Sequence, residues 1–201
     1  MLDPVRESAR LAELDRLKVV GTAPEPLFDE IARVASLLCD APFAAVSLVE
    51  EQAEWYKARW GLDLPPACRE QALCAAVVES GKVLVVADAG ADERFASLSA
   101  VRDGGIRLYA GAPIFTSRGE VVGTVCVKDR RKRGLQEWQA SGLEGLAREL
   151  DQQLHLELQN KLNDNVAALA ASIQQMAKMG GLSSMLDKLP SRLPDNHTCI
   201  L

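Results

Sequence analysis

Histidine is nearly absent from the sequence, and this absence excludes several kinds of chemistry. The two histidines are His155, within a long helical pattern, and His197, near the end of the chain. They offer no metal-binding cluster and no nucleophile–base pair, so we expect no metal, no cofactor and no catalytic residue. The glycine pairs 104–105 and 180–181 also lack the flanking residues of a phosphate-binding loop. The sequence therefore predicts a protein that is not an enzyme.

Long apolar runs and an excess of basic charge are missing as well. The longest apolar runs, such as residues 41–49, are much shorter than the roughly 20 residues that span a membrane, so no membrane span is expected. Acidic residues outnumber basic ones by 28 to 23, and the resulting negative charge would not attract nucleic acid. Because the five cysteines are unevenly spaced and no signal sequence opens the chain, we expect a cytoplasmic protein with free thiols.

What is present fits one domain with appendages, because 201 residues with 48% hydrophobic content bury one sizeable core. Apolar spacing predicts helices at 4–20, 27–38 and 69–79, and β-rich runs predict strands at 43–49, 55–60, 83–86, 108–115 and 121–127. This order indicates an α+β fold around an antiparallel sheet. We divide the chain into an N-terminal helix (1–21), a core domain (22–155), a helical extension (156–179) and a methionine-containing tail (180–201).

A long helix is predicted from Gln136 to about Lys178 by an unbroken apolar stripe with helical spacing. Such a helix is on the order of 65 Å long, about twice the diameter of a small domain, so part of its stripe needs a partner. The same helix of a second copy would serve, which predicts a homodimer. The residues assigned to dimer or partner contacts are Leu146, Leu150, Leu154, Leu158, Leu162, Met176, Met179 and Met185. Alternatively, the helix breaks at residues 163–165 and folds back on itself.

Six blocks of sequence resemble, in order and spacing, the GAF domains that precede bacterial signalling enzymes. The blocks are Phe43–Val49, Trp55–Leu62, Cys74–Val78, Asp88–Phe95, Arg107–Ile114 and Gly123–Asp129. The resemblance covers about residues 22–155. It implies a six-stranded antiparallel sheet with a pair of terminal helices on one face and a small-molecule pocket on the other. In this subfamily a histidine commonly occupies the place of Ala76, so a pocket that uses this imidazole is not expected.

A ligand in such a pocket would be surrounded by a small set of residues. They are Leu73, Cys74, Val77, Phe95, Arg107, Tyr109 and Cys126. Strands would form the floor, and the polar stretch 88–99, anchored by Phe95, would form a lid. Arg107 could pair with an anion, and Tyr109 could stack on the ligand or donate a hydrogen bond. The alternative is that all of these are ordinary core and rim residues.

The thiols matter because one small GAF family reduces free methionine sulfoxide with cysteines. Cys74 on an apolar helix face and Cys126 in an apolar strand are typical of inert core thiols. Cys68 is expected to be more exposed and to be the redox-sensitive thiol. In related photoreceptors the cysteine that carries a tetrapyrrole is followed by histidine, whereas Cys74 is followed by Ala75, so no pigment is expected.

The tail holds a second resemblance. The segment Ile173–Pro190 is similar to the start of the methionine-rich domain of the signal recognition particle protein, which binds apolar signal helices. Flexible methionines around a Gly-Gly hinge would suit a partner helix, and the alternative is a frayed terminal segment.

Three functions follow from these patterns. The first is a homodimeric regulatory GAF protein that senses a small molecule or the redox state and signals to a partner protein through the long helix. The second is an adaptor whose tail captures an apolar helix. The third is a reductase of free methionine sulfoxide.

Overall fold

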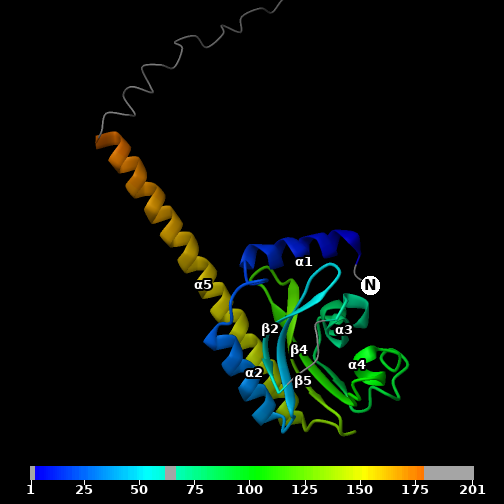
Figure 1. Ribbon diagram of the computed structural model, residues 1–201. Coiled ribbons are helices and arrows are strands. Elements are labelled where there is room, and N and C mark those ends of the chain that lie inside the picture. The colour runs from blue at the N-terminus through cyan, green and yellow to red at the C-terminus, as the bar shows by residue number, and fades with distance from the viewer. Residues whose placement is uncertain (1–2, 62–66, 179–201) are drawn as a thin grey trace, which may run out of the picture. The chain divides into compact units, whose positions relative to one another are not determined.

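The computed structural model describes residues 3–61 and 67–178, which fall into two units, one ending at Leu156 and one beginning at Glu157 (Figure 1). The helical elements are α1 (Pro4–Leu17), α2 (Pro26–Leu38), the short 3₁₀ helix η1 (Arg69–Gln71), α3 (Leu73–Ser80), α4 (Ser99–Arg102) and α5 (Glu137–Lys178). The strands are β1 (Phe43–Val49), β2 (Glu54–Trp60), β3 (Leu84–Val86), β4 (Leu108–Phe115) and β5 (Val121–Asp129).

No helix in the described part of the chain is both long enough and apolar enough to cross a membrane.

The first unit is built on an antiparallel sheet with the strand order β2-β1-β5-β4-β3, which confirms the predicted α+β class. The GAF resemblance implied six strands, and this expectation is wrong for the described residues, which form five. The backbone between β3 and β4 makes local turn bonds instead of a strand ladder. Phe95 N donates to Asp92 O at 2.9 Å, and Leu98 N donates to Phe95 O at 3.0 Å.

Helices cover both faces of this sheet, so alternate residues of each strand face different layers. In Figure 1, α2 and the first part of α5 lie side by side on one face, while α3 and α4 lie on the other. Gln139 on α5 donates from Nε2 to Leu38 O at the end of α2, at 3.2 Å. On β5, Cys126 faces α3 and shares a cluster of buried residues with Leu73 and Val77. The face under α3 is therefore where the predicted ligand residues collect.

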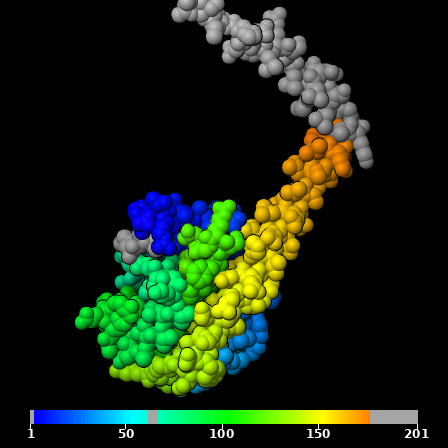
Figure 2. Space-filling view, turned by 180° about the vertical axis from the view of Figure 1, so that it is seen from behind, coloured from blue at the N-terminus to red at the C-terminus, as the bar shows by residue number. Residues whose placement is uncertain are grey.

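Polar contacts join α1 to the sheet. The helix begins at a cap in which the Asp3 side chain accepts the backbone N–H groups of the first turn. Arg10, which is only 1% exposed, donates from Nη1 to Val49 O at 2.6 Å. Glu13 Oε1 lies 3.0 Å from Arg118 Nη1 in the β4–β5 turn, and Figure 2 shows this turn (green) next to α1 (dark blue). These contacts make α1 part of the packed first unit.

The α5 helix is unbroken from Glu137 to Lys178, so the alternative of a break at residues 163–165 is wrong. Four of its apolar residues in the first unit are buried, namely Leu143, Ala147, Leu150 and Leu154. Leu150 and Leu154 were expected at the dimer interface, and this expectation is corrected, because the core of the same chain already covers them. In the second unit the large exposed apolar residues of the helix are Leu162, Val166, Leu169, Ile173 and Met176.

The predicted helix-binding tail, including Met179 and Met185, lies outside the described residues, as does Cys199. The adaptor hypothesis therefore stays a prediction.

Candidate functional site

Buried side chains gather between the sheet and α3, and we call this set the interior cluster. Its members are Ala45, Val49, Leu73, Cys74, Val77, Val78, Val86, Ala89, Phe95, Leu98, Val101, Ile106, Tyr109, Val121 and Cys126. Six of the seven residues predicted to surround a ligand belong to it, namely Leu73, Cys74, Val77, Phe95, Tyr109 and Cys126. The structure brings the predicted floor and walls together, and their role in binding stays a prediction.

The seventh residue, Arg107, is bonded to the backbone of α4 and of the loop between α4 and β4. Its Nη1 donates to Val101 O at 2.9 Å and to Ile106 O at 3.0 Å. Its Nε lies 4.0 Å from Asp88 Oδ1, and Asp88 Oδ2 also pairs with Lys132 Nζ at 2.7 Å. Arg107 therefore stabilises this loop, which differs from its expected role as the partner of a ligand anion.

Sequence reasoning missed three polar residues that we call the buried polar group, Glu54, Tyr56 and Lys128. Tyr56 OH donates to Glu54 Oε2 at 3.1 Å and accepts a hydrogen bond from Lys128 Nζ at 3.2 Å. Glu54 is only 2% exposed and Lys128 only 3%. Tyr56 packs against the interior cluster, and Lys128 is the cross-strand partner of Tyr109. A carboxylate and an ammonium thus lie at the two ends of a hydrogen-bond chain inside the protein.

Two oxygens, Glu54 Oε1 within this group and Tyr109 OH beside it, have no hydrogen-bond partner among the described residues. Burying a charged group costs several kcal/mol unless other groups satisfy it completely. A core that served only packing would place apolar side chains at these positions. The group is therefore a candidate site for a polar ligand. A signal was present in the sequence, because Glu54 and Tyr56 are two residues apart in a strand and so share a face.

Two thiols meet in the interior cluster. Cys74 Sγ donates to Cys126 Sγ at 3.8 Å, and Ser47 Oγ lies 3.9 Å from Cys126 Sγ. The hydrogen bond from Cys74, helped by the Lys128 ammonium, outweighs burial and lowers the pKa of Cys126 to about 7. Burial raises the pKa of Cys74, which keeps its proton. Cys126 therefore differs from the inert core thiol that the sequence suggested, while Cys68 is exposed as expected.

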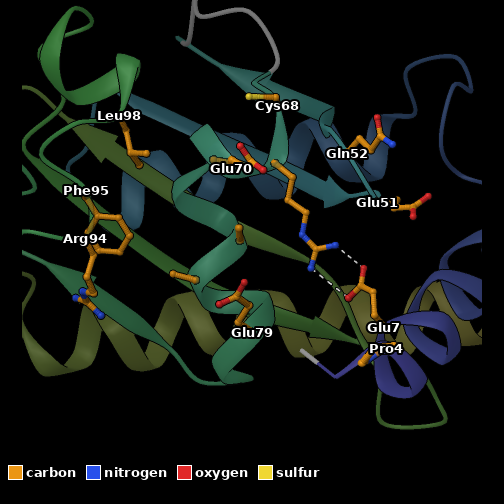
Figure 3. Close-up of a pocket in the computed structure, with 14 residues that line it drawn as sticks. Pro4, Glu7, Glu51, Gln52, Cys68, Glu70, Glu79, Arg94, Phe95 and Leu98 are labelled. Carbon is orange, nitrogen blue, oxygen red and sulfur yellow. Dashed lines mark hydrogen bonds and ion pairs between the residues drawn. The ribbon is translucent and has the colours of Figure 1, made fainter. Parts of the chain in front are cut away.

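A hollow of about 890 Å³ opens on the outer side of α3 (Figure 3). Its lining consists of Pro4, Glu7, Glu51, Gln52, Cys68, Arg69, Glu70, Ala72, Ala75, Ala76, Glu79, Arg94, Phe95 and Leu98. Its volume is typical of a small-molecule site. Phe95 and Leu98 line the hollow and also belong to the interior cluster. These two residues and α3 therefore form the wall between the hollow and the interior cluster.

A charge network fixes one side of the hollow. Glu7 accepts hydrogen bonds from Arg10 Nε at 3.1 Å and Nη2 at 2.7 Å. It also accepts from Arg69 Nη2 at 3.1 Å, and Figure 3 shows this pair as dashed lines. The bonds from Arg10, followed by those from Arg69, lower the pKa of Glu7 to about 2 against an opposing effect of burial. The network joins α1 to η1 across the rim of the hollow.

Replacing Glu7 with glutamine is expected to lower the free energy of unfolding by about 1–2 kcal/mol at pH 7. Because folding lowers this pKa, the stabilisation is complete above the ordinary value of 4.5 and is lost as the pH falls towards 2. The measurement is urea denaturation at several pH values. Glu30→Gln is the control, since Glu30 pairs with Arg33 on the exposed surface. An equal loss at pH 7 and at pH 3 would contradict the prediction.

Comparison with known sequences identifies a family and a curated relative. The model of the GAF domain family matches residues 23–154. The cyclic di-GMP phosphodiesterase PA2567 of Pseudomonas aeruginosa is 35% identical over 154 residues, which are 76% of this chain and 26% of that protein. The chain thus spans about a quarter of the length of this curated relative.

Solved structures share the fold at low sequence identity. The GAF domain of an Acinetobacter phosphoenolpyruvate-protein phosphotransferase aligns with a TM-score of 0.53 and 16% identity, over 77% of this chain and 94% of that chain. The free methionine-R-sulfoxide reductase of Neisseria meningitidis, solved in complex with its substrate, aligns with a TM-score of 0.55 and 18% identity, over 79% of this chain and 88% of that chain. At these identities the likeness shows the fold alone.

The expectation that the protein is not an enzyme is contradicted by these comparisons. The curated relative is named as a phosphodiesterase, and one of the aligned structures is a reductase. The shortage of histidine excluded only chemistry that depends on histidine, and it left thiol and carboxylate chemistry open.

Proposed function

Because this chain belongs to the GAF domain family, we propose that it is a regulatory module that binds a small molecule in the interior cluster and passes the signal through α5. The observation that carries the proposal is the buried polar group. Its carboxylate and ammonium lie on the sheet face under α3 with polar oxygens left unpaired. A ligand with hydrogen-bonding groups of its own would satisfy these atoms.

The hollow on the outer side of α3 supplies the approach. Phe95 and Leu98 lie on a stretch that is held mainly by local turn bonds, so this stretch is the part of the wall that costs least to move. Outward movement of Phe95 would connect the hollow to the buried polar group. The binding site that we propose is therefore the interior cluster, and the hollow is its entrance.

The partner that we propose is a signalling enzyme. The matched residues make up only a quarter of a protein named as a cyclic di-GMP phosphodiesterase, so a module like this one accompanies a larger remainder in that relative. By analogy, ligand binding here would control a cyclic-dinucleotide enzyme. The proposed means of control is a population shift in the packing of α5 against the first unit's core.

We propose that the second unit carries the signal as a parallel coiled coil with a second copy of the chain. The exposed apolar residues Leu162, Val166, Leu169, Ile173 and Met176 follow one another at spacings of four, three, four and three residues. This is a heptad pattern with the β-branched Val166 and Ile173 at the a positions, and leucine or methionine at d, which favours two parallel strands. The flanking e and g positions from 163 to 177 carry only asparagine, alanine and serine, so no like charges oppose pairing of identical helices.

Replacing Leu169 with aspartate is expected to convert the dimer into a monomer, because the substitution buries a charge at a central d position. Analytical ultracentrifugation at micromolar concentration measures the change. The matched control is Ala171→Asp, which adds the same charge at the outward f position of the same turn. A wild type that is already monomeric, or a Leu169→Asp variant that stays dimeric, would show that this stripe does not join two copies.

Native mass spectrometry of the reduced full chain tests ligand and dimer together. We expect a dimer that retains a small molecule, and we expect the double variant Glu54→Gln/Lys128→Met to lose this molecule. A wild-type dimer without a ligand, for which added candidate ligands produce no mass shift either, would overturn the binding role of the buried polar group. That result would leave the coiled coil in place.

A second candidate function is reduction of free methionine sulfoxide. The observation that favours it is the contact between Cys74 and Cys126, which places a thiol of lowered pKa beside a second thiol. A turnover assay with dithiothreitol decides this candidate. Turnover that stops in Cys126→Ser would support it, and no turnover by the wild type would rule it out.

A further inference from the structure

Two thiols of the interior cluster, Cys74 and Cys126, lie close enough to react with each other. Cys74 lies in the first turn of α3 and Cys126 on β5 beneath it, with both side chains fully buried. Their sulfur atoms are 3.8 Å apart, and no disulfide joins them. A disulfide has a bond length of about 2 Å, so small side-chain and helix movements would bring the two sulfurs together.

Polar and charged groups on several neighbouring elements surround the Cys126 thiol. The Cys74 thiol and the Ser47 hydroxyl lie within hydrogen-bond reach, and the Lys128 ammonium adds a positive charge on the same strand. Glu54 opposes the thiolate with a negative charge, while the Tyr56 and Tyr109 hydroxyls lie close by. The donors prevail over burial, and the pKa of Cys126 falls to about 7. The Cys74 hydrogen bond and the Lys128 charge therefore favour the thiolate form of Cys126, next to a thiol whose pKa is raised.

The other described cysteines show that this arrangement is specific. Cys39 is equally buried, yet burial raises its pKa to about 11, and the Arg133 charge offsets only part of this rise. Cys68 is exposed on the rim of the hollow. Neither cysteine is bonded to another thiol in the described structure. Cys39 therefore serves as the control for a buried thiol, and Cys68 as the control for an exposed thiol.

We propose that Cys126 and Cys74 form a dithiol that reacts with hydrogen peroxide and closes into a disulfide. The Cys126 thiolate attacks one peroxide oxygen, the O–O bond breaks, and Cys126 becomes a sulfenic acid. The released hydroxide takes up the proton that Cys126 had given to solvent and leaves as water. The Cys74 sulfur then attacks the sulfenic sulfur, the S–O bond breaks, and the hydroxyl leaves with the Cys74 proton as a second water. Two thiols are oxidised by two electrons, and one peroxide is reduced to two waters.

The disulfide would change the proposed ligand site. It fixes the first turn of α3 to β5 and draws the wall of the hollow towards the sheet, so less room remains over the buried polar group. Oxidised protein is therefore expected to bind ligand more weakly than reduced protein. This consequence depends on the proposed function, whereas the dithiol reaction is measured without any ligand.

The test treats reduced full chain with hydrogen peroxide at near-stoichiometric amounts, followed by alkylation under denaturing conditions and peptide mapping. We expect a mass loss of two hydrogens, two fewer alkylated thiols and a cross-linked peptide pair that contains Cys74 and Cys126. Cys39→Ser and Cys68→Ser should form the same bond. Cys126→Ser should react at least about 10-fold more slowly, and Cys74→Ser should stop at a sulfenic acid that dimedone traps at Cys126.

If a serine variant fails to fold, the peptide map of the oxidised wild-type protein is sufficient to test the proposal. Oxidation that begins at Cys68 while Cys74 and Cys126 remain alkylated would overturn it. A disulfide between two chains, or one that involves Cys39, would overturn it equally. If the intramolecular bond forms but ligand binding is unchanged, the dithiol reaction stands, and its effect on the ligand site is wrong.

Discussion

Replacing Lys128 with methionine is expected to lower the free energy of unfolding by about 3–5 kcal/mol at pH 7. The substitution keeps most of the side-chain volume and removes the ammonium that compensates Glu54. Glu54 is 2% exposed, and one of its oxygens already lacks a partner, so the remaining carboxylate would be buried without an opposing charge. Urea denaturation followed by circular dichroism measures the change, with an unaltered m-value as the sign that the folded state is intact.

The double variant Glu54→Gln/Lys128→Met is the control for Lys128→Met, and it also tests whether the two charges bind ligand. Removing both charges together leaves no unpaired ion, so we expect it to recover most of the stability lost in Lys128→Met. A double variant that is stable but retains no ligand would assign the charges to binding. One that is as unstable as Lys128→Met would assign them to the fold. A Lys128→Met variant within about 0.5 kcal/mol of wild type would contradict the premise that the two charges are buried together.

The sequence predicted the fold and most of the interior cluster because both depend on periodicity. Alternating apolar residues place Tyr109 and Cys126 on one sheet face, and helical spacing places Leu73 and Val77 on the helix above. Periodicity shows that Glu54 shares a face with Tyr56 and Lys128 with Cys126, but it does not tell whether these charged residues are buried. β1 and β2 change register between Val46 and Ser47, and this irregularity decides how β2 lies against its neighbour.

Periodicity was also insufficient to describe the long helix α5. Its apolar stripe predicted the whole of α5, yet the stripe alone does not tell where the core of the first unit ends. Leu150 and Leu154 are buried in this core, whereas Leu162 and Leu169 are exposed. The change from helical to heptad spacing at Leu162 was the available signal, since a heptad repeat indicates pairing of helices with one another.

The thiols show why a pKa is harder to predict than a location. Cys126 was correctly placed in an apolar strand, and burial alone would make such a thiol inert. Its reactivity depends on Cys74, which is 52 residues away in sequence, and on Lys128, which is two residues away on the same face. Only the first of these contacts needs the tertiary structure, so the strand pattern Cys-Val-Lys was a usable signal for a stabilised thiolate.

The side chain of Asp151, on α5, links this helix to the sheet. Its Oδ1 accepts a hydrogen bond from the backbone N–H of Phe115, the last residue of β4, at 2.9 Å. Burial raises the pKa of Asp151 to about 7, against the opposing effects of the Phe115 hydrogen bond and of Arg148. The end of the strand that carries Tyr109 is thus fixed to α5 by a carboxyl group that titrates near neutral pH.

Asp151→Asn is expected to be more stable than wild type by about 2–4 kcal/mol at pH 8, and the gain should shrink towards zero near pH 4. The folded state binds this proton more tightly than the unfolded state. The stability that protonated Asp151 contributes to the wild type is therefore fully present below the ordinary pKa of 3.8, and it is lost as the pH rises to about 7. Asparagine keeps an oxygen for the Phe115 N–H and has no proton to lose.

Thermal or urea unfolding of both proteins across this pH range measures the gain, with Asp164→Asn on the exposed part of α5 as the control that should show no pH-dependent difference. A gain that is the same at pH 4 and pH 8 would mean that packing, and not charge, separates the two variants. A gain confined to high pH would mean that deprotonation of Asp151 weakens the joint between β4 and α5. The route that we propose for the signal would then respond to pH as well as to ligand.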